Sequence, residues 1–418
     1  MLPRTRRPLY QDRSGQRRHR PDYILVLLSV LLLVTGLIVV YAISPGLAAQ
    51  KHVSDNYFVT KQLVTILLGV ITFGVVSQVP LRYWQGLRWP LIVLAGAATL
   101  AALALPVSAD YPAHRWIRLG GQSLQSVEMI KFALVICLAG FLADKVRGGV
   151  MADNKQTVQP LLIVLVVLGI VVAGAQRDLG STGVLVFMVA AMAYVAGLPL
   201  KRVMQISAII VVGTVLAVAS IGYRRDRILT FLHPEQDCQD AGYQACQALI
   251  AVGSGGIAGK GLSHGAQAYG YLPEASNDSI FAIMAEKFGF IGTTLLVALF
   301  MGLFSRVKSI LERAPDAFSR LMVTGVLAWL STQTLINIGA MIGLLPLKGI
   351  TLPFISAGGT SVIFVAAAIG LVFQVSRYTT FGVNEHHDQA AVAAPSRGTA
   401  VTYRTRRGQA AGEAGRGR

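Results

Sequence analysis

About ten long apolar runs, separated by short polar segments, constrain this chain more than any other feature of its sequence. Runs of roughly 17–25 apolar residues are long enough to cross a bilayer. They must then be helical, because the bilayer core offers no hydrogen-bond partners to a bare backbone. Charged residues make up 14% of the chain, against about 25% in a typical soluble domain. We therefore predict an all-α, polytopic integral membrane protein with about ten transmembrane helices.

The predicted spans follow one another through residues 23–375, which we expect to form one transmembrane domain. Residues 1–22 and 376–418 are expected to be disordered cytoplasmic tails, and residues 222–279 a large outer loop between the seventh and eighth spans. The spans are expected at Tyr23–Ile43, Val59–Val79, Pro90–Leu105, Val127–Ala143, Pro160–Gly174, Thr182–Ala196, Val203–Ile221, Ile280–Phe304, Leu321–Leu345 and Ile355–Phe373.

The positive charges predict the orientation of these spans. With about ten spans both tails lie on one side, and that side carries most of the 37 lysines and arginines. Cytoplasmic loops are enriched in Lys and Arg, so the tails are placed in the cytoplasm and the large loop outside. The net charge of +17 has the same explanation, and we expect no nucleic-acid partner.

The polar stretch from Gln247 to Gly292 is where we expect the chemistry. It is rich in glycine between Gly253 and Gly265 and reaches Asp278 just before the eighth predicted span. Aspartate at a helix start is a favoured capping residue. A carboxylate at a membrane–water boundary is also suited to act as a general base. The residue chemistry alone leaves both interpretations of Asp278 open.

Charged residues near the ends of spans are further candidates, because charge is costly inside a membrane. Glu128 and Lys131 share one helix face and could form a structural ion pair or face a substrate. Arg177 and Asp178 form either a structural cap or pair, or a functional site. Arg115 is either an interface anchor or a ligand for a lipid phosphate.

A second group of arginines, Arg224, Arg225 and Arg227, lies on the predicted outer side, against the positive-inside bias. Such a cluster needs an anionic partner such as a diphosphate, or is a structural exception. Cys238 and Cys246 flank a polar outer segment, where a disulfide and two free thiols are both open. No cluster of His, Cys and Glu has the spacing of a zinc site.

Several ordered blocks of the sequence resemble the SEDS (shape, elongation, division and sporulation) family of peptidoglycan polymerases. The run from Lys348 to Pro353 is more similar to the division branch than to the elongation branch. The blocks are His114 to Ile117 with Glu128 and Lys131, Gln176 to Gly180, Arg227 to Leu229, Gly253 to Gly256 with Gly259 and Gly261, Leu272 to Ala282, Asn337 to Gly339, and Gly343 to Gly359.

The resemblance implies an inverting glycosyltransferase that polymerises lipid II on the outer face of the cytoplasmic membrane, at the division septum, and releases undecaprenyl diphosphate. It implies a class B penicillin-binding protein and other division-complex proteins as partners, and leaves room for a divalent cation, Mg or Mn. The glycines are expected to let the backbone approach the sugars. Asp278 is the candidate catalytic base, and the candidate substrate-binding residues are Arg115, Glu128, Lys131, Arg227, Lys260, Glu274 and Ser356.

The chain departs from the family pattern at several positions. The family usually has proline at the position of Arg177, proline and serine where this chain has Ser126 and Val127, and aromatic residues at the positions of Ser279 and Ala357. The lost aromatic bulk bears on acceptor preference or rate. A lipid II flippase, an elongation-type polymerase and a scaffold for a transpeptidase are the alternative functions.

Overall fold

A helix occupies each predicted span. The computed structural model describes residues 17–18, 20–105, 114–119, 122–219, 238–239, 242–347 and 349–379. The helices are α1 Tyr23–Lys51, α2 Tyr57–Gln78, α3 Leu81–Gly86, α4 Arg88–Ala104, α5 Ser126–Arg147, α6 Gln159–Leu168, α7 Leu179–Val195, α8 Leu200–Ala219, α10 Tyr243–Ser254, α11 Ile280–Glu312, α12 Ala317–Met341 and α13 Gly359–Ser376. The π-helical turns η1 Asn154–Val158 and η2 Gly169–Ala175 flank α6, and a 3-10 turn, η4, covers Gln267–Tyr269.

Strands are few and short in the described part of the chain, so the all-α prediction is confirmed. Strand β2 (Trp116–Leu119) pairs antiparallel with β3 (Gln122–Gln125) in a hairpin before α5. Strand β1 (Arg17–Arg18) pairs antiparallel with β4 (Tyr378–Thr379), which joins the two ends of the described chain.

Seven of the described helices are long and apolar enough to cross a membrane: α1, α2, α5, the η1–α6–η2 segment, α11, α12 and α13. Helices α4 and α7 are apolar but shorter. Many large apolar side chains point outward, for example Val93 at 69% exposure and Leu67 at 59%. An outward apolar surface suits a lipid surrounding, and the protein is a multi-pass membrane protein.

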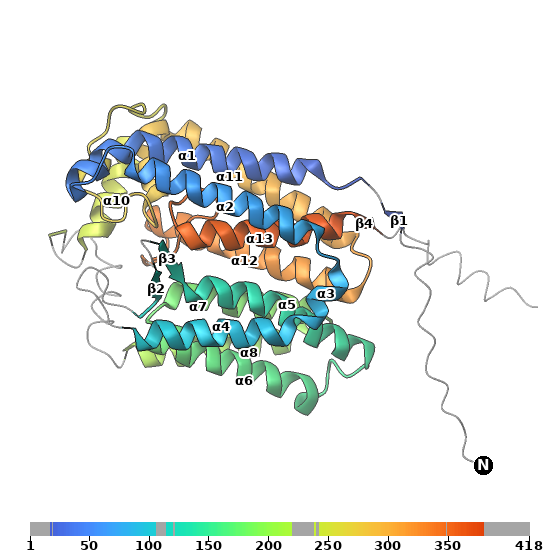
Figure 1. The fold of residues 1–418 in the computed structure, drawn as a ribbon. Coiled ribbons are helices and arrows are strands. Elements are labelled where there is room, and N and C mark those ends of the chain that lie inside the picture. Colours follow the sequence, from blue (N-terminus) through green and yellow to red (C-terminus); the bar gives the residue numbers. More distant parts are fainter. Residues whose placement is uncertain are drawn as a thin grey trace, which may run out of the picture. The chain divides into compact units, whose positions relative to one another are not determined.

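Three helices form the core of the bundle. Helices α5, α12 and α13 are buried along most of their apolar lengths, whereas α2 and α11 expose most of theirs. Figure 1 shows α12 and α13 between a layer containing α1, α2 and α11 and a layer containing α4 to α8. Helices α12 and α13 contact both layers, and α5 packs against both of them from the second layer, so these helices connect the segments that build the site.

Several predicted boundaries differ from the structure, among them the end of α12 and the limits of the outer loop. Helix α12 ends at Met341 rather than Leu345, and Gly343 just beyond it has a φ of 78°, the left-handed conformation that commonly ends helices. The predicted outer loop 222–279 contains helix α10, which was not expected. The helix forms because its apolar side chains Ala248 and Ala251 pack against α11.

The polar connections gather at one end of the bundle. The β2–β3 hairpin, α10 and the segment that leads into α11 lie together there (Figure 1). The β1–β4 pair lies at the opposite end, together with the Asp22–Arg306 ion pair at 2.5 Å. Residues far apart in the sequence, from the hairpin to the start of α13, are thus brought to a common region.

Candidate functional site

Asp278 lies two residues before α11 and does not cap it. The N-cap residue is Ser279, whose side chain makes no capping hydrogen bond. The Asp278 Oδ1 atom is buried and has no hydrogen-bond partner among the described residues. The capping interpretation of Asp278 is therefore wrong, and its carboxylate is left available for chemistry.

The surroundings of Asp278 make its carboxyl group a weaker acid. Burial, followed by the negative charge of Glu274, raises the pKa of Asp278 from 3.8 to about 7. The positive charge of Arg115 acts in the opposite direction. A general base works best when its pKa lies near the working pH, so this carboxylate is suited to accept a proton at neutral pH.

Arg115 faces Asp278 across Gly349. A Cβ atom placed on Gly349 would lie 3.4 Å from Asp278 Oδ2 and 3.7 Å from Arg115 Nη1. Arg115 donates from Nε to the Gln176 carbonyl at 2.8 Å and from Nη2 to the Arg177 carbonyl. These bonds fix the guanidinium with Nη1 beside Gly349, so a carboxylate and a cation lie on one small region of the Gly349 segment.

The segment that carries Gly349 is tied to the Asp278 loop. The side-chain amide of Asn337 on α12 donates to the carbonyl of Asp278 at 2.8 Å and to that of Ile350 at 2.7 Å. The backbone N–H of Ala357 donates to the Ser276 carbonyl at 2.8 Å. One amide thus sets the distance between the two segments that carry Asp278 and Gly349.

Ser356 supports the same arrangement. It is 1% exposed, and its hydroxyl donates to the Asn277 carbonyl at 2.5 Å and accepts from the Leu352 N–H at 2.8 Å. These bonds hold the loop beside Asp278. Substrate binding by Ser356 stays a prediction.

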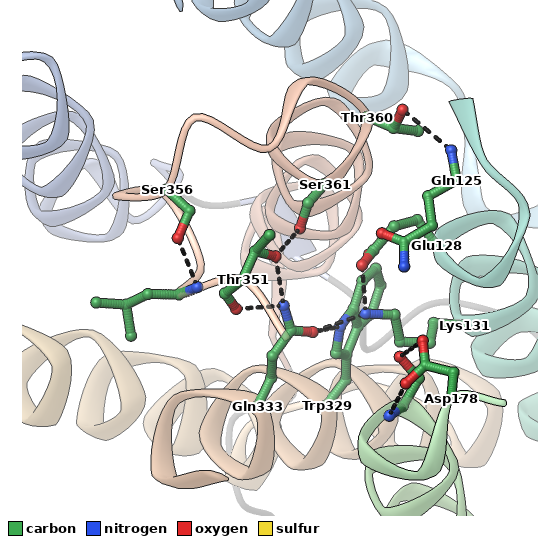
Figure 2. Close-up of polar contacts among 12 residues, drawn as sticks. Gln125, Glu128, Lys131, Asp178, Trp329, Gln333, Thr351, Ser356, Thr360 and Ser361 are labelled. Atoms are coloured by element: carbon green, nitrogen blue, oxygen red, sulfur yellow. Dashed lines mark hydrogen bonds and ion pairs between the residues drawn. The ribbon is translucent and has the colours of Figure 1, made fainter. Parts of the chain in front are cut away.

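Glu128 and Lys131 form the predicted ion pair, at 2.7 Å, with side chains that are 3% and 0% exposed. Lys131 Nζ also donates to Gln333 Oε1 at 2.7 Å and lies 5.1 Å from the centre of the Trp329 ring. Figure 2 shows Lys131 between Glu128 and Gln333. Gln333 in turn donates to the Thr351 carbonyl at 2.9 Å. The pair therefore supports the Gly349 segment from inside the bundle.

Asp178 is a structural helix cap, which is one of the two interpretations that the sequence left open. It is the N-cap residue of α7, and its two carboxylate oxygens accept from the backbone N–H and the hydroxyl of Ser181, both at 2.9 Å. Arg177, next to it, has a φ of 54°. A proline, with φ near −65°, cannot adopt this conformation. Arginine in place of the family's proline therefore allows the backbone conformation in which the Arg177 carbonyl accepts a hydrogen bond from Arg115.

The glycine-rich segment approaches a helix. A Cβ on Gly255 would lie 1.9 Å from the Ala285 carbonyl, and one on Gly259 would lie 2.2 Å from that of Lys287. The chain of α11 is non-helical at Gly289, where Phe290 N–H donates to the Gly256 carbonyl at 2.9 Å. These glycines allow close contact with the α11 backbone, and their approach to the sugars stays a prediction.

Lys260 and Glu274 are the remaining described candidates. Lys260 Nζ lies 3.6 Å from the buried carboxylate of Glu286. Glu274 is exposed, with a φ of 51°, and accepts from Asn277 Nδ2 at 2.5 Å. The left-handed conformation of a glutamate is a strained one, and such strain is concentrated at functional sites. Their contact with substrate stays a prediction.

Arg227, like Arg224 and Arg225, lies outside the described residues. In the described part of the chain, no three His, Cys, Asp or Glu side chains come together to hold a metal ion. Mg²⁺ is usually held by one or two carboxylates together with substrate phosphates and waters, so the carboxylates of Asp278 and Glu274 alone do not define a metal site. We therefore derive no step through a metal.

Sequence reasoning missed the supporting role of Gln333 and Asn337. Both amides stand in the predicted ninth span, where a polar side chain signals a specific buried partner. They are four residues apart, so they lie on one face of α12. The structure also joins Cys238 and Cys246 in a disulfide, which settles the two open alternatives for these cysteines.

Comparisons with known proteins agree over most of the chain. The family model described as "Cell cycle protein", for FtsW, RodA and SpoVE, matches residues 23–381. Stage V sporulation protein E of Bacillus subtilis is 35% identical over 368 residues, which cover 87% of this chain and 99% of that protein. The probable peptidoglycan glycosyltransferase FtsW of Saccharophagus degradans is 35% identical over 376 residues, with coverage of 88% and 95%.

Solved structures share the fold. A chain from the work "Structural coordination of polymerization and crosslinking by a peptidoglycan synthase complex" is 26% identical, with a TM-score of 0.67 and coverage of 85% of this chain and 98% of that one. RodA of Thermus thermophilus is 25% identical, with a TM-score of 0.63 and coverage of 85% and 97%. The chain therefore belongs to the SEDS family of cell cycle proteins, the family of FtsW, RodA and SpoVE, and is close to FtsW.

Proposed function

We propose that the chain is a peptidoglycan glycosyltransferase that polymerises lipid II into glycan strands during cell division. Curated relatives with 32–35% identity are named probable peptidoglycan glycosyltransferase FtsW, which supports the reaction class. The observation that carries the proposal is the pairing of Asp278 with Arg115 across Gly349. A base and a cation on either side of a glycine are what a single displacement at a sugar diphosphate requires.

In this reaction the 4-hydroxyl of the acceptor glycan attacks the anomeric carbon of the sugar diphosphate. The new C–O bond forms as the bond to the diphosphate oxygen breaks, so the configuration inverts. Asp278 takes the hydroxyl proton, a contribution of about 10²–10⁴-fold. Arg115 Nη1 neutralises the charge that develops on undecaprenyl diphosphate as it leaves.

The other candidates have supporting roles in this proposal. Lys131 is fully buried against Glu128, so we assign this pair an indirect role through Gln333 and Thr351. Arg227 and Lys260 would add positive charge for the diphosphate. Glu274 and Ser356 would contact the sugars or hold the loops that do.

We place the site at the outer face of the cytoplasmic membrane, with both termini in the cytoplasm. The described basic side chains at the β1–β4 end, including Arg306 and Arg377, support this orientation through the positive-inside rule. At the septum the expected partner is a class B penicillin-binding protein. A related structure comes from a complex that coordinates polymerisation and crosslinking, which supports such a partner.

A lipid II flippase is the main alternative. A transporter needs polar groups along its full depth. The buried charges described in the spans all lie within the first eight residues of α5 or α11, at the site end: Glu128, Lys131, Glu286 and Lys287. This distribution favours the polymerase. The elongation branch is a closer alternative, because RodA of Thermus thermophilus shares the fold.

The test is to supply purified protein with lipid II, with and without a class B penicillin-binding protein, and to resolve the products on a gel. We expect a ladder of glycan strands. Reconstituted vesicles that translocate lipid II and form no polymer would instead assign the transporter.

A further inference from the structure

Helix α10 packs along the first turns of α11. Its side chains Cys246, Ala248 and Ala251 are 6%, 1% and 0% exposed. At its far end, a Cβ on Gly255 would lie 1.9 Å from the Ala285 carbonyl, so the two backbones touch there. The segment of α11 closest to Asp278 is therefore supported along its length by α10.

At its near end α10 reaches the residue that follows Asp278. Gln244 Nε2 donates to the hydroxyl of Ser279 at 3.1 Å. Ser279 is fully buried and is the N-cap residue of α11. Its backbone N–H donates to the Glu274 carbonyl at 3.2 Å. A side chain from α10 is thus bonded one residue away from the proposed base.

The Cys238–Cys246 disulfide encloses Gln244. Its two cysteines are eight residues apart, and their Cα atoms are 5.6 Å apart. Cys246 lies two residues after Gln244 in α10, about half a turn away, and is buried. A crosslink that closes so short a loop restricts the conformations open to the residues inside it.

We propose that Gln244, held at the start of α10 by the Cys238–Cys246 disulfide, is a positioning residue that fixes the Asp278 carboxylate through Ser279. The proposal rests on the proposed function of Asp278 as base. Asn337 holds the Asp278 carbonyl from the side of α12. Gln244 holds the next side chain from the side of α10. Asp278 and the residue after it are therefore each hydrogen-bonded from a different helix, at a backbone carbonyl and at a side-chain hydroxyl.

Because the disulfide holds the segment around Gln244, the hydrogen bond from Gln244 to Ser279 should be sensitive to reduction. A dithiol reagent such as dithiothreitol delivers two electrons and two protons to the disulfide, giving two thiols, while the reagent closes into its own disulfide. Freed from the crosslink, the segment around Gln244 samples more conformations and holds Ser279 less often. Reduction is then expected to lower turnover without removing any group that contacts substrate.

The first test is a double-mutant cycle on Gln244→Ala and Ser279→Ala in lipid II polymerisation. Loss of one neutral hydrogen bond predicts a fall in kcat of roughly two- to tenfold for each single variant, with KM unchanged. The double variant should fall no further, because both changes remove the same bond. Gln78→Ala, at an exposed glutamine at the end of α2, is the matched control and should keep the parent rate.

The second test compares oxidised and reduced protein. Dithiothreitol should lower kcat of the parent by a similar factor and shift the pH at half-maximal rate, which a general loss of folded protein would not do. The Cys238→Ser, Cys246→Ser double variant should show the reduced rate and no response to the reagent. Because Cys137 is already a free buried thiol, it contributes no reductive change.

Hydrogen exchange at the first turn of α11 gives a readout independent of turnover. Exchange of the backbone amides of residues 280–284 should be faster in Gln244→Ala and in the reduced parent than in the oxidised parent. Unchanged exchange together with unchanged kcat and pH profile would overturn the proposal. A parent that fails to polymerise lipid II would contradict the proposed function instead, and the exchange measurement would still decide the role of Gln244.

Discussion

Arg115 and Asp278 approach the same point of Gly349, with Arg115 Nη1 at 3.7 Å and Asp278 Oδ2 at 3.4 Å from the position that a Cβ atom would take there. Both distances are ordinary van der Waals contacts, so a methyl group fits. A larger side chain would occupy the space between the base and the cation. The gap at Gly349 is therefore a direct probe of whether substrate passes between these two residues.

Substitutions at Gly349 should act by size. Gly349→Ala should keep a rate within about threefold of the parent, because its Cβ makes no close contact. Gly349→Leu should lose nearly all polymerisation while its melting temperature in detergent stays near that of the parent. Equal rates for the two variants would show that the reaction does not use this gap.

Asn337 should affect the rate of lipid II polymerisation through the two backbone segments that it holds together. Asn337→Ala removes two hydrogen bonds, to the carbonyls of Asp278 and Ile350, and lets the two segments separate. Loss of about 1–3 kcal/mol is expected for buried groups left unsatisfied. The kcat for lipid II should therefore fall by roughly tenfold to a hundredfold.

Ser331→Ala, on the same helix, is the control for Asn337→Ala. Ser331 bonds only within α12, and its removal should leave kcat unchanged. A normal rate for Asn337→Ala would mean that the Asp278 loop does not depend on α12.

The buried pair of Glu128 and Lys131 should show strong coupling in stability. Removing one partner leaves an unpaired buried charge, which costs about 3–5 kcal/mol, whereas replacing both with apolar groups is close to neutral. Lys131→Met alone should lower the melting temperature clearly. The Glu128→Leu, Lys131→Met double variant should recover most of that loss. Additive losses would show that the two charges are not a stabilising unit.

The rate should depend on pH through Asp278. Because burial and Glu274 raise the pKa of Asp278 to about 7, the carboxylate form is lost as pH falls through 7. We expect the rate of polymerisation to rise up to about pH 7 and level off above it. Glu274→Gln removes the negative charge that contributes to the raised pKa, so the midpoint of the pH–rate profile should move to lower pH. A midpoint that stays near 4 would contradict the burial of Asp278.

The raised pKa of Asp278 also makes the stability of the folded protein depend on pH. Stability is expected to fall as pH rises, whereas the rate is expected to rise. The folded protein binds the Asp278 proton more tightly than the unfolded chain, whose pKa is near 3.8. That contribution is fully present below about pH 4 and is lost as pH rises through 7. Asp278→Asn avoids the loss, so the variant should melt above the parent at pH 8 and close to it at pH 4. Parallel melting curves at both pH values would argue against this linkage.

The sequence predicted the helices well because length and apolarity determine a membrane span. It also offered the Glu128–Lys131 pair and the Asp178 cap among its open alternatives, because their partners are one helical turn away. Asn337 binds Asp278 across 59 residues, and no local pattern signals that contact. Long-range contacts of this kind follow only from how the helices pack.

The start of α11 near Asp278 shows most clearly what the sequence could not predict. Ser276, Asn277 and Asp278 are all favoured capping types, and residue preference alone favoured Asp278 as the cap. The left-handed turn at Glu274 lets the Asn277 and Ser279 N–H groups donate to the Glu274 carbonyl instead. Ser279 then takes the cap position, and Asp278 Oδ2 lies beside Gly349. A backbone conformation that glutamate rarely adopts could not be expected from composition.

The central claim is that Asp278 is the base of a lipid II polymerase. The most direct measurement is glycan formation from lipid II by purified Asp278→Asn, with Asp153→Asn as the matched control, since Asp153 is a partly exposed cap residue of η1. We predict that Asp278→Asn loses at least about 10²-fold in rate while it remains folded, and that Asp153→Asn keeps the parent rate. Polymerisation by Asp278→Asn at the parent rate would contradict the account.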